Sequence, residues 1–159
     1  MVGICGQIGE RSYDIDSFAE QLKYHPGENV TTFQGDGVSV GRITHSTKPA
    51  DQPAESENFL LWVWGAILGH ERRGEYTYRP DGVTDAKYCA NLYDKFGQSF
   101  VAGLNSEFDC IIFNKDDDSV SIFTDRLSSR PIYYTRTNDG SFALFNLATT
   151  AYYEFRFLS

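Results

Sequence analysis

The sequence predicts one α+β domain over residues 1–159, built from short antiparallel strands and two helices. Two stretches carry apolar residues at helical spacing, and three pairs of strand-like segments flank short polar turns. Hydrophobic residues make up 41% of the chain and aromatic residues 15%, which is enough to form a core. Hairpins combined with few helices are typical of the α+β class.

The first helix is expected shortly after a strand over residues 2–8. Ser17 to Glu20 fits the capping box that begins many helices. Pro26-Gly27 is expected to end the helix. Its apolar face consists of four residues at helical spacing: Ile15, Phe18, Ala19 and Leu22.

Three predicted hairpins share one pattern, in which two strands rich in β-branched and aromatic residues flank a polar turn. They comprise residues 30–33 with 38–44, 108–113 with 120–124, and 132–136 with 142–147, across turns at 35–37, 116–118 and 138–140. The polar, proline-bearing segment 48–57 is predicted to be a loop.

Two further elements complete the predicted layout. The run from Phe59 to Trp64 is apolar at every position, which indicates a strand buried on both faces. A second helix is expected from Thr84 to Phe96, with Gly97 as its C-terminal stop. Its apolar face would comprise Tyr88, Cys89, Leu92, Tyr93 and Phe96.

Composition excludes several classes of function. The net charge of -8 disfavours nucleic acid as a partner, because phosphate binding needs a basic face. No apolar stretch is long enough to span a membrane. Cys5, Cys89 and Cys110 lack metal-ligand spacing and the histidines are scattered, so neither a metal nor another cofactor is expected. An odd cysteine count without an export signal favours the cytoplasm.

The most specific motifs are LNSEF at 104–108 and DRLSSRPIYY at 125–134. The opening MVGICG, the DQP at 51–53, and Thr84-Asp85 followed by Leu92-Tyr93 and Gly97 accompany them in order. Together these segments resemble the class II glutamine amidotransferase domain of the asparagine synthetase family. The resemblance implies an N-terminal nucleophile hydrolase-like fold, a four-layer αββα sandwich of two antiparallel sheets.

The chemistry that this resemblance implies needs a cysteine at the mature amino terminus, whose own α-amino group serves as the base. An asparagine side chain and backbone N–H groups stabilise the oxyanion. An arginine binds the carboxylate of glutamine, and an aspartate takes its ammonium group.

The expected pocket has lost most of these groups. Val2 occupies the nucleophile position, and valine has neither a proton nor a lone pair to offer. Trp64-Gly65-Ala66 stands where the family has Asn-Gly-Glu, so an indole replaces the oxyanion amide. Thr44 falls near the arginine position, with Arg42 two residues away, while Asp85 is retained. We therefore expect no catalytic residues, and a pseudoenzyme.

Two alternatives stay open at this point. Cleavage after Ile4 would make Cys5 the amino-terminal nucleophile, because Cys5-Gly6-Gln7-Ile8-Gly9 also fits the family opening. Alternatively, the former pocket, still bearing Asp85, would hold another small amine or amino acid.

The later motif is expected to be structural. Asp125 and Arg126 look catalytic in isolation, but the resemblance places them in a buried ion pair or hydrogen-bonded corner. That corner would hold the Arg130-Pro131 turn and the strand that carries Tyr133.

The C-terminal stretch 152–158 is unusually apolar and aromatic. In the family this region leads into an ATP-using synthetase domain with a Ser-Gly-Gly-rich pyrophosphate loop, and the sequence has no such loop. We therefore expect a scaffold or regulatory domain. Its aromatic C-terminus would bind a second copy of the chain or a separate synthetase-type protein.

Overall fold

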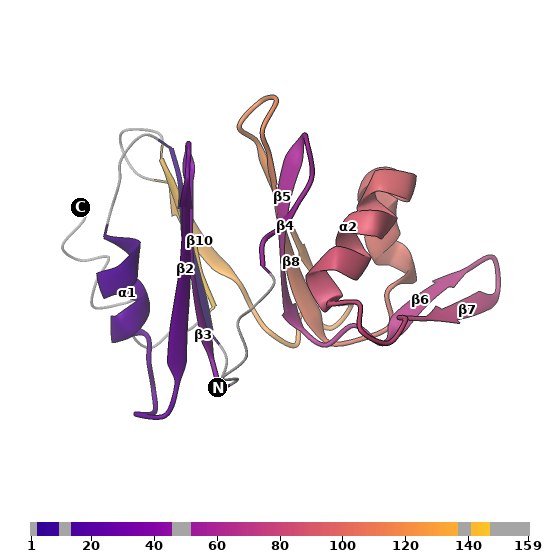
Figure 1. Ribbon diagram of the computed structural model, residues 1–159, viewed down its shortest axis with the longest axis horizontal. Coiled ribbons are helices and arrows are strands. Elements are labelled where there is room, and N and C mark those ends of the chain that lie inside the picture. The colour runs from indigo at the N-terminus through magenta and orange to yellow at the C-terminus, as the bar shows by residue number, and fades with distance from the viewer. Residues whose placement is uncertain (1–2, 10–13, 46–51, 137–140, 147–159) are drawn as a thin grey trace. The chain divides into compact units, whose positions relative to one another are not determined.

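The structure, a computed structural model, describes residues 3–9, 14–45, 52–136 and 141–146. Within these ranges it confirms the α+β class, with antiparallel sheets and two α-helices (Figure 1). Neither helix is long and apolar enough to cross a bilayer. The chain divides into two compact units: unit 1 comprises residues 1–50 and 131–159, and unit 2 comprises residues 51–130. Each unit carries one helix packed on one sheet, as a half of an αββα sandwich would.

Unit 1 contains an antiparallel sheet in the order β10-β11-β1-β3-β2. Its strands are β1 (Gly3–Ile8), β2 (Asn29–Gly35), β3 (Val38–Thr44), β10 (Tyr133–Arg136) and β11 (Phe142–Phe145). Both predicted hairpins of this unit are confirmed by the β2–β3 and β10–β11 pairings. The turn predicted at 138–140 and the aromatic C-terminus lie outside the described residues.

Helix α1 (Ile15–Gln21) packs on this sheet. It buries Ile15, Ala19 and Leu22 against residues of β1 and β3. The N-cap lies three residues before the predicted one: Asp14 caps the helix, and its carboxylate accepts hydrogen bonds from both the N–H and the hydroxyl of Ser17. The capping prediction was therefore wrong, because an aspartate upstream already satisfies the first turn.

Unit 2 contains a four-stranded sheet in the order β4-β5-β8-β9. Its strands are β4 (Ala54–Glu55), β5 (Phe59–Gly65), β8 (Phe108–Asn114) and β9 (Val120–Thr124). The burial of β5 on both faces and the β8–β9 hairpin are confirmed. The predicted loop over 48–57 needs correction, since Ala54 and Glu55 pair with Leu61 and Leu60 of β5.

Helix α2 (Asp85–Phe96) has the predicted ends, with Thr84 as N-cap and Gly97 as C-cap. It is followed by a 3-10 helix, η1 (Gly97–Gly103), which was not predicted from the sequence. One face of the sheet packs against α2 and η1 to form the core of unit 2. That core includes Leu61, Val63, Cys89, Leu92 and Cys110.

A further hairpin, which the sequence did not predict, is formed by β6 (Gly69–Arg72) and β7 (Glu75–Tyr78). Figure 1 shows it extending away from the four-stranded sheet, beside α2. The Tyr88 hydroxyl donates to the Thr77 carbonyl at 3.2 Å and lies 2.7 Å from His70 Nδ1. The hairpin is thus tied to the helix.

Candidate functional site

The end of β5 carries two of the predicted pocket residues. Trp64 is 1% exposed, and Gly65 follows it with a φ of 97°. A Cβ atom at residue 65 would lie 2.1 Å from the Glu107 carbonyl oxygen, so only glycine fits. Two residues further on, the N–H of Ile67 donates to Asp85 Oδ1 at 3.2 Å. The structure therefore brings Trp64, Gly65 and Asp85 to one end of the unit 2 sheet.

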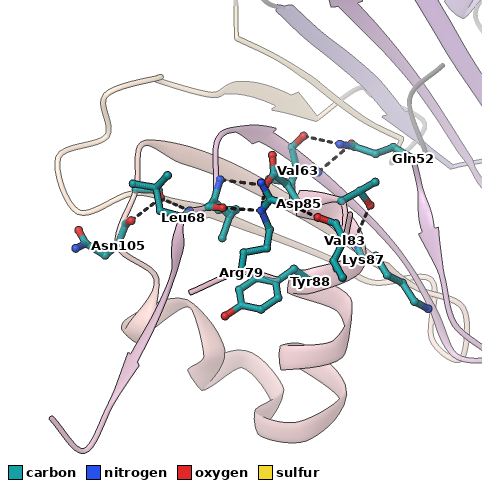
Figure 2. Close-up of polar contacts among 12 residues, drawn as sticks. Gln52, Val63, Leu68, Arg79, Val83, Asp85, Lys87, Tyr88 and Asn105 are labelled. Carbon is teal, nitrogen blue, oxygen red and sulfur yellow. Dashed lines mark hydrogen bonds and ion pairs between the residues drawn. The ribbon is translucent and has the colours of Figure 1, made fainter. Parts of the chain in front are cut away.

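The Asp85 carboxylate is engaged by a cation of the same unit, as Figure 2 shows. Arg79 Nε lies 3.0 Å from Asp85 Oδ1 and also donates to the Ile67 carbonyl at 2.9 Å. A second guanidinium nitrogen of Arg79 donates to the Val83 carbonyl. Asp85 is the first residue of α2, where the positive end of the helix dipole further favours a carboxylate. Its charge is therefore neutralised within the unit.

Arg79 was not singled out by sequence reasoning. The available signal was its position before the turn that leads into the Thr84 cap. An arginine at that position can reach the first turn of α2, where Asp85 lies.

Gln52 supports β5 just before Trp64. Its amide donates to the Val63 carbonyl and accepts from the Val63 N–H, both at 3.1 Å (Figure 2). The Gln52 side chain therefore makes the two backbone hydrogen bonds to Val63 that a neighbouring strand would otherwise make. Beside it lies an open groove of about 480 Å³, lined in part by Glu55, Thr84 and Lys87.

In unit 1, Cys5 lies on the face of β1 that packs against α1. It is fully buried, and its Sγ lies 3.7 Å from the Gly41 carbonyl oxygen, to which the thiol donates. Burial raises the pKa of the thiol to about 12, although the hydrogen bond to Gly41 works in the opposite direction. A Cβ atom at residue 41 would lie 2.8 Å from this sulfur and 2.7 Å from the Ala19 Cβ. Cys5 is thus a tightly packed core residue.

Thr44, another expected pocket residue, belongs to unit 1. Thr44 is half-buried at the end of β3, where it pairs with Asn29 of β2. Val2 lies outside the described residues.

Asp125 organises the turn that follows β9. Its Oδ1 accepts from the N–H of Leu127 at 2.8 Å and from the N–H of Ser129 at 3.2 Å. Burial acts to raise the pKa of Asp125, but these N–H groups outweigh it and hold that pKa below its usual value. Arg126 instead donates to the Ala102 carbonyl at 3.1 Å. Arg130 ends the turn before Pro131, and Tyr133 is 43% exposed on β10.

A buried acid on β8 was missed by sequence reasoning. Asp109 is 1% exposed and stands opposite Trp64 of β5 and Thr124 of β9. Within the described ranges neither of its carboxylate oxygens has a hydrogen-bond partner. Burial raises the pKa of Asp109 to about 7; Arg130 works against this rise and Asp125 adds to it. A carboxylate inside the apolar run 108–113 was the available signal.

Comparisons with known proteins identify the family to which the chain belongs. A family model described as "Glutamine amidotransferase domain" matches residues 39–149. A probable asparagine synthetase [glutamine-hydrolyzing] of Dictyostelium discoideum is 29% identical over 94 residues, which is 55% of this chain and 16% of that protein. An asparagine synthetase [glutamine-hydrolyzing] of Brassica oleracea is 28% identical over 95 residues, covering 57% of this chain and 16% of that protein. The alignments thus span about a sixth of each relative. Since the family model covers well over half of the sequence, the chain belongs to the glutamine amidotransferase domain family.

Proposed function

We propose that this domain does not hydrolyse glutamine and acts instead as a partner-binding domain, with a synthetase-type protein or a second copy as the partner. The burial of the Cys5 thiol carries the proposal. The family chemistry needs a thiol at a free amino terminus, next to its own amine and in reach of the substrate. Val2 offers no nucleophile at that position, and the nearest thiol in the sequence is packed in the core beneath α1.

Trp64 supports the same conclusion. At the position where the resemblance implies an asparagine amide, the chain has an indole that is 1% exposed. An indole has a single N–H, and its rigid bicyclic volume is much larger than that of an amide. Loss of one oxyanion donor typically costs ~2.7–4 kcal/mol of transition-state stabilisation.

The pairing of Asp85 also supports the proposal that the domain does not hydrolyse glutamine. The aspartate that would take the ammonium group of glutamine is already paired with Arg79 and with the N–H of Ile67. An incoming amine would have to displace the guanidinium. The same pairing weighs against the amino-acid-binding alternative.

The alternative in which Cys5 is exposed by cleavage after Ile4 conflicts with the packing of Ile4. This residue is fully buried, and it exchanges hydrogen bonds with Asn146 through its N–H at 2.8 Å and its carbonyl at 3.1 Å. Cleavage would remove both bonds and a core side chain from β1.

Exposed apolar side chains support the partner-binding role. Leu68 is 63% exposed and Tyr78 is 75% exposed, and both lie at the base of the β6–β7 hairpin, where the Arg79 N–H bonds to the Leu68 carbonyl. Exposed apolar groups of this size often mark interaction sites when they cluster. The aromatic stretch 152–158 adds a second apolar segment.

The proposal is tested by the mass of the mature chain and by its assembly. Intact mass spectrometry of protein purified from its native host should show a polypeptide that still contains Gly3 and Ile4. A mature chain beginning at Cys5 would overturn the proposal. Light scattering should report a complex that weakens in a Leu68→Ser/Tyr78→Ser variant or on deletion of residues 152–159. A monomer with no co-purifying protein would count against the binding role.

A further inference from the structure

Strand β9 forms one edge of the unit 2 sheet, and in the described part of the chain no strand pairs with its outer side. Natural proteins usually guard such an edge with a lysine, a proline, a bulge or a very short strand. The sequence of β9 is VSIFT, and its register with β8 runs without a bulge. At the other edge of the sheet, β4 is only two residues long. The edge formed by β9 therefore lacks the usual protection against pairing.

The hydrogen bonds at the two ends of the β8–β9 ladder fix the orientation of the backbone groups between them. The Asn114 N–H donates to the Ser119 carbonyl at 2.8 Å, just before β9 begins. The Asp125 N–H donates to the Phe108 carbonyl at 2.9 Å, just after β9 ends. In an antiparallel pair, hydrogen-bonded positions alternate with positions whose N–H and C=O groups point away from the partner strand. Both ends give the same alternation.

This alternation leaves three residues of β9 with backbone groups that face the open edge. Ser121 and Phe123 are the positions that bond to β8. The alternate positions, whose N–H and C=O groups point outward, are Val120, Ile122 and Thr124. The outward groups are arranged symmetrically about Ile122. The edge is therefore complementary to a second copy of itself that runs in the opposite direction.

We propose that two copies of the chain pair their β9 strands antiparallel, with a twofold axis at Ile122. In this register Ile122 exchanges two backbone hydrogen bonds with the partner's Ile122, and Val120 does the same with the partner's Thr124. All three side chains are β-branched, a type that packs well across strands. The inference rests on the partner-binding role proposed above and assigns a second copy of the chain to a defined surface.

The charges at the two ends of β9 are complementary in the same register. Three exposed aspartates, at positions 116–118, precede the strand, and the exposed Arg126 and Leu127 follow it. Antiparallel pairing about Ile122 brings the turn before β9 in one copy towards the turn after β9 in the other. Arg126 then lies at the end of the interface that carries the partner's aspartates. The same end carries Leu127, whose side chain is 86% exposed.

Sedimentation of the full-length chain over a range of concentrations tests the pairing. The chain should form a dimer, and its Kd should rise about tenfold or more in Ile122→Pro. Proline removes the outward N–H of residue 122 and leaves the bonds between β8 and β9 in place. Ile122→Val keeps that N–H and should leave Kd unchanged.

Leu127→Ser tests the same interface without altering the strand. Leu127 serves its turn through the backbone N–H, which donates to Asp125, so the variant should fold normally. Its Kd should rise about tenfold, because an apolar side chain of the interface is lost from both copies. Tyr24→Ser is the matched control at a 76% exposed residue of unit 1, and it should leave Kd unchanged.

Amide exchange locates the interface by residue. The outward N–H groups of Val120, Ile122 and Thr124 should exchange about tenfold or more slowly in the dimer than in the dilute monomer. A chain that stays monomeric at all concentrations, or a dimer in which these three amides gain no protection, would overturn the β9 pairing. A dimer weakened by Leu68→Ser/Tyr78→Ser but not by Leu127→Ser would overturn it as well, while still supporting the partner-binding role.

Discussion

Arg79 Nε lies 3.0 Å from Asp85 Oδ1, and the pair joins the turn before α2 to the first residue of that helix. In an active domain of this family, the equivalent aspartate is implied to receive the ammonium group of glutamine. Here the same carboxylate is paired with Arg79 and accepts a hydrogen bond from the N–H of Ile67. This pairing is one of the observations behind the proposal that the domain does not hydrolyse glutamine.

Replacing Arg79 should destabilise the protein more than replacing a surface cation. Arg79→Met removes hydrogen bonds to Asp85, Ile67 and Val83 and leaves a half-buried carboxylate without its cation. We expect a loss of ~2 kcal/mol in the free energy of unfolding. Lys115→Met is the matched control, because Lys115 pairs with an exposed Glu55 and should cost ~1 kcal/mol or less. Equal urea midpoints for the two variants would contradict the structural role of Arg79.

The packing around Cys5 predicts a strong effect at Gly41. Gly41→Ala would place a Cβ atom against the Cys5 sulfur and the Ala19 Cβ, so overpacking should cost ~1–3 kcal/mol. Gly27→Ala is the control, since a Cβ there meets nothing within 4 Å. Thermal unfolding should show a clear loss of Tm only for the Gly41 variant. A neutral Gly41→Ala would mean that Cys5 is more loosely held than described.

Asp109 should make stability fall as pH rises. Its folded pKa, about 7, lies above the ordinary value of 3.8. The stability that this difference contributes is therefore complete below pH 3.8 and lost as pH rises to 7. Asp109→Asn should be more stable than the parent at pH 8, by ~1–3 kcal/mol, and equal to it near pH 4. Urea unfolding at both pH values measures this; a gap independent of pH would refute it.

Glu28 should show the opposite pH dependence. Burial acts to raise its pKa, but the N–H groups of His25 and Tyr24, at 3.1 and 2.6 Å, contribute to a folded pKa of about 2. A depressed pKa stabilises the fold above the ordinary value of 4.5, and this contribution is lost as pH falls towards 2. Glu28→Gln should therefore lower Tm at pH 7, and the deficit should shrink between pH 4.5 and pH 2. A deficit that stays constant across this range would show that packing, not charge, is responsible.

Local patterns were sufficient to predict much of the fold. Helix α2 was predicted with both ends because Thr84 and Gly97 are strong local signals. The β2–β3 and β8–β9 hairpins followed from alternating apolar residues around polar turns. These features depend on neighbours within a few residues, which a sequence displays directly.

Features that depend on tertiary contacts could not be predicted in this way. The β6–β7 hairpin has a polar sequence, and its register is tied to α2 by the bonds from Tyr88 to His70 and Thr77. The pairing of Arg79 with Asp85 and the isolation of Asp109 depend on where distant segments meet. At the candidate site, motif positions were predictable and the partners of each side chain were not.

The central claim, that the domain is silent as a glutaminase, is tested most directly by glutamate formation from glutamine with the purified full-length chain. The account predicts a rate equal to the buffer background and unchanged by Cys5→Ala. Turnover at an enzyme-like rate that disappears in Cys5→Ala would contradict it.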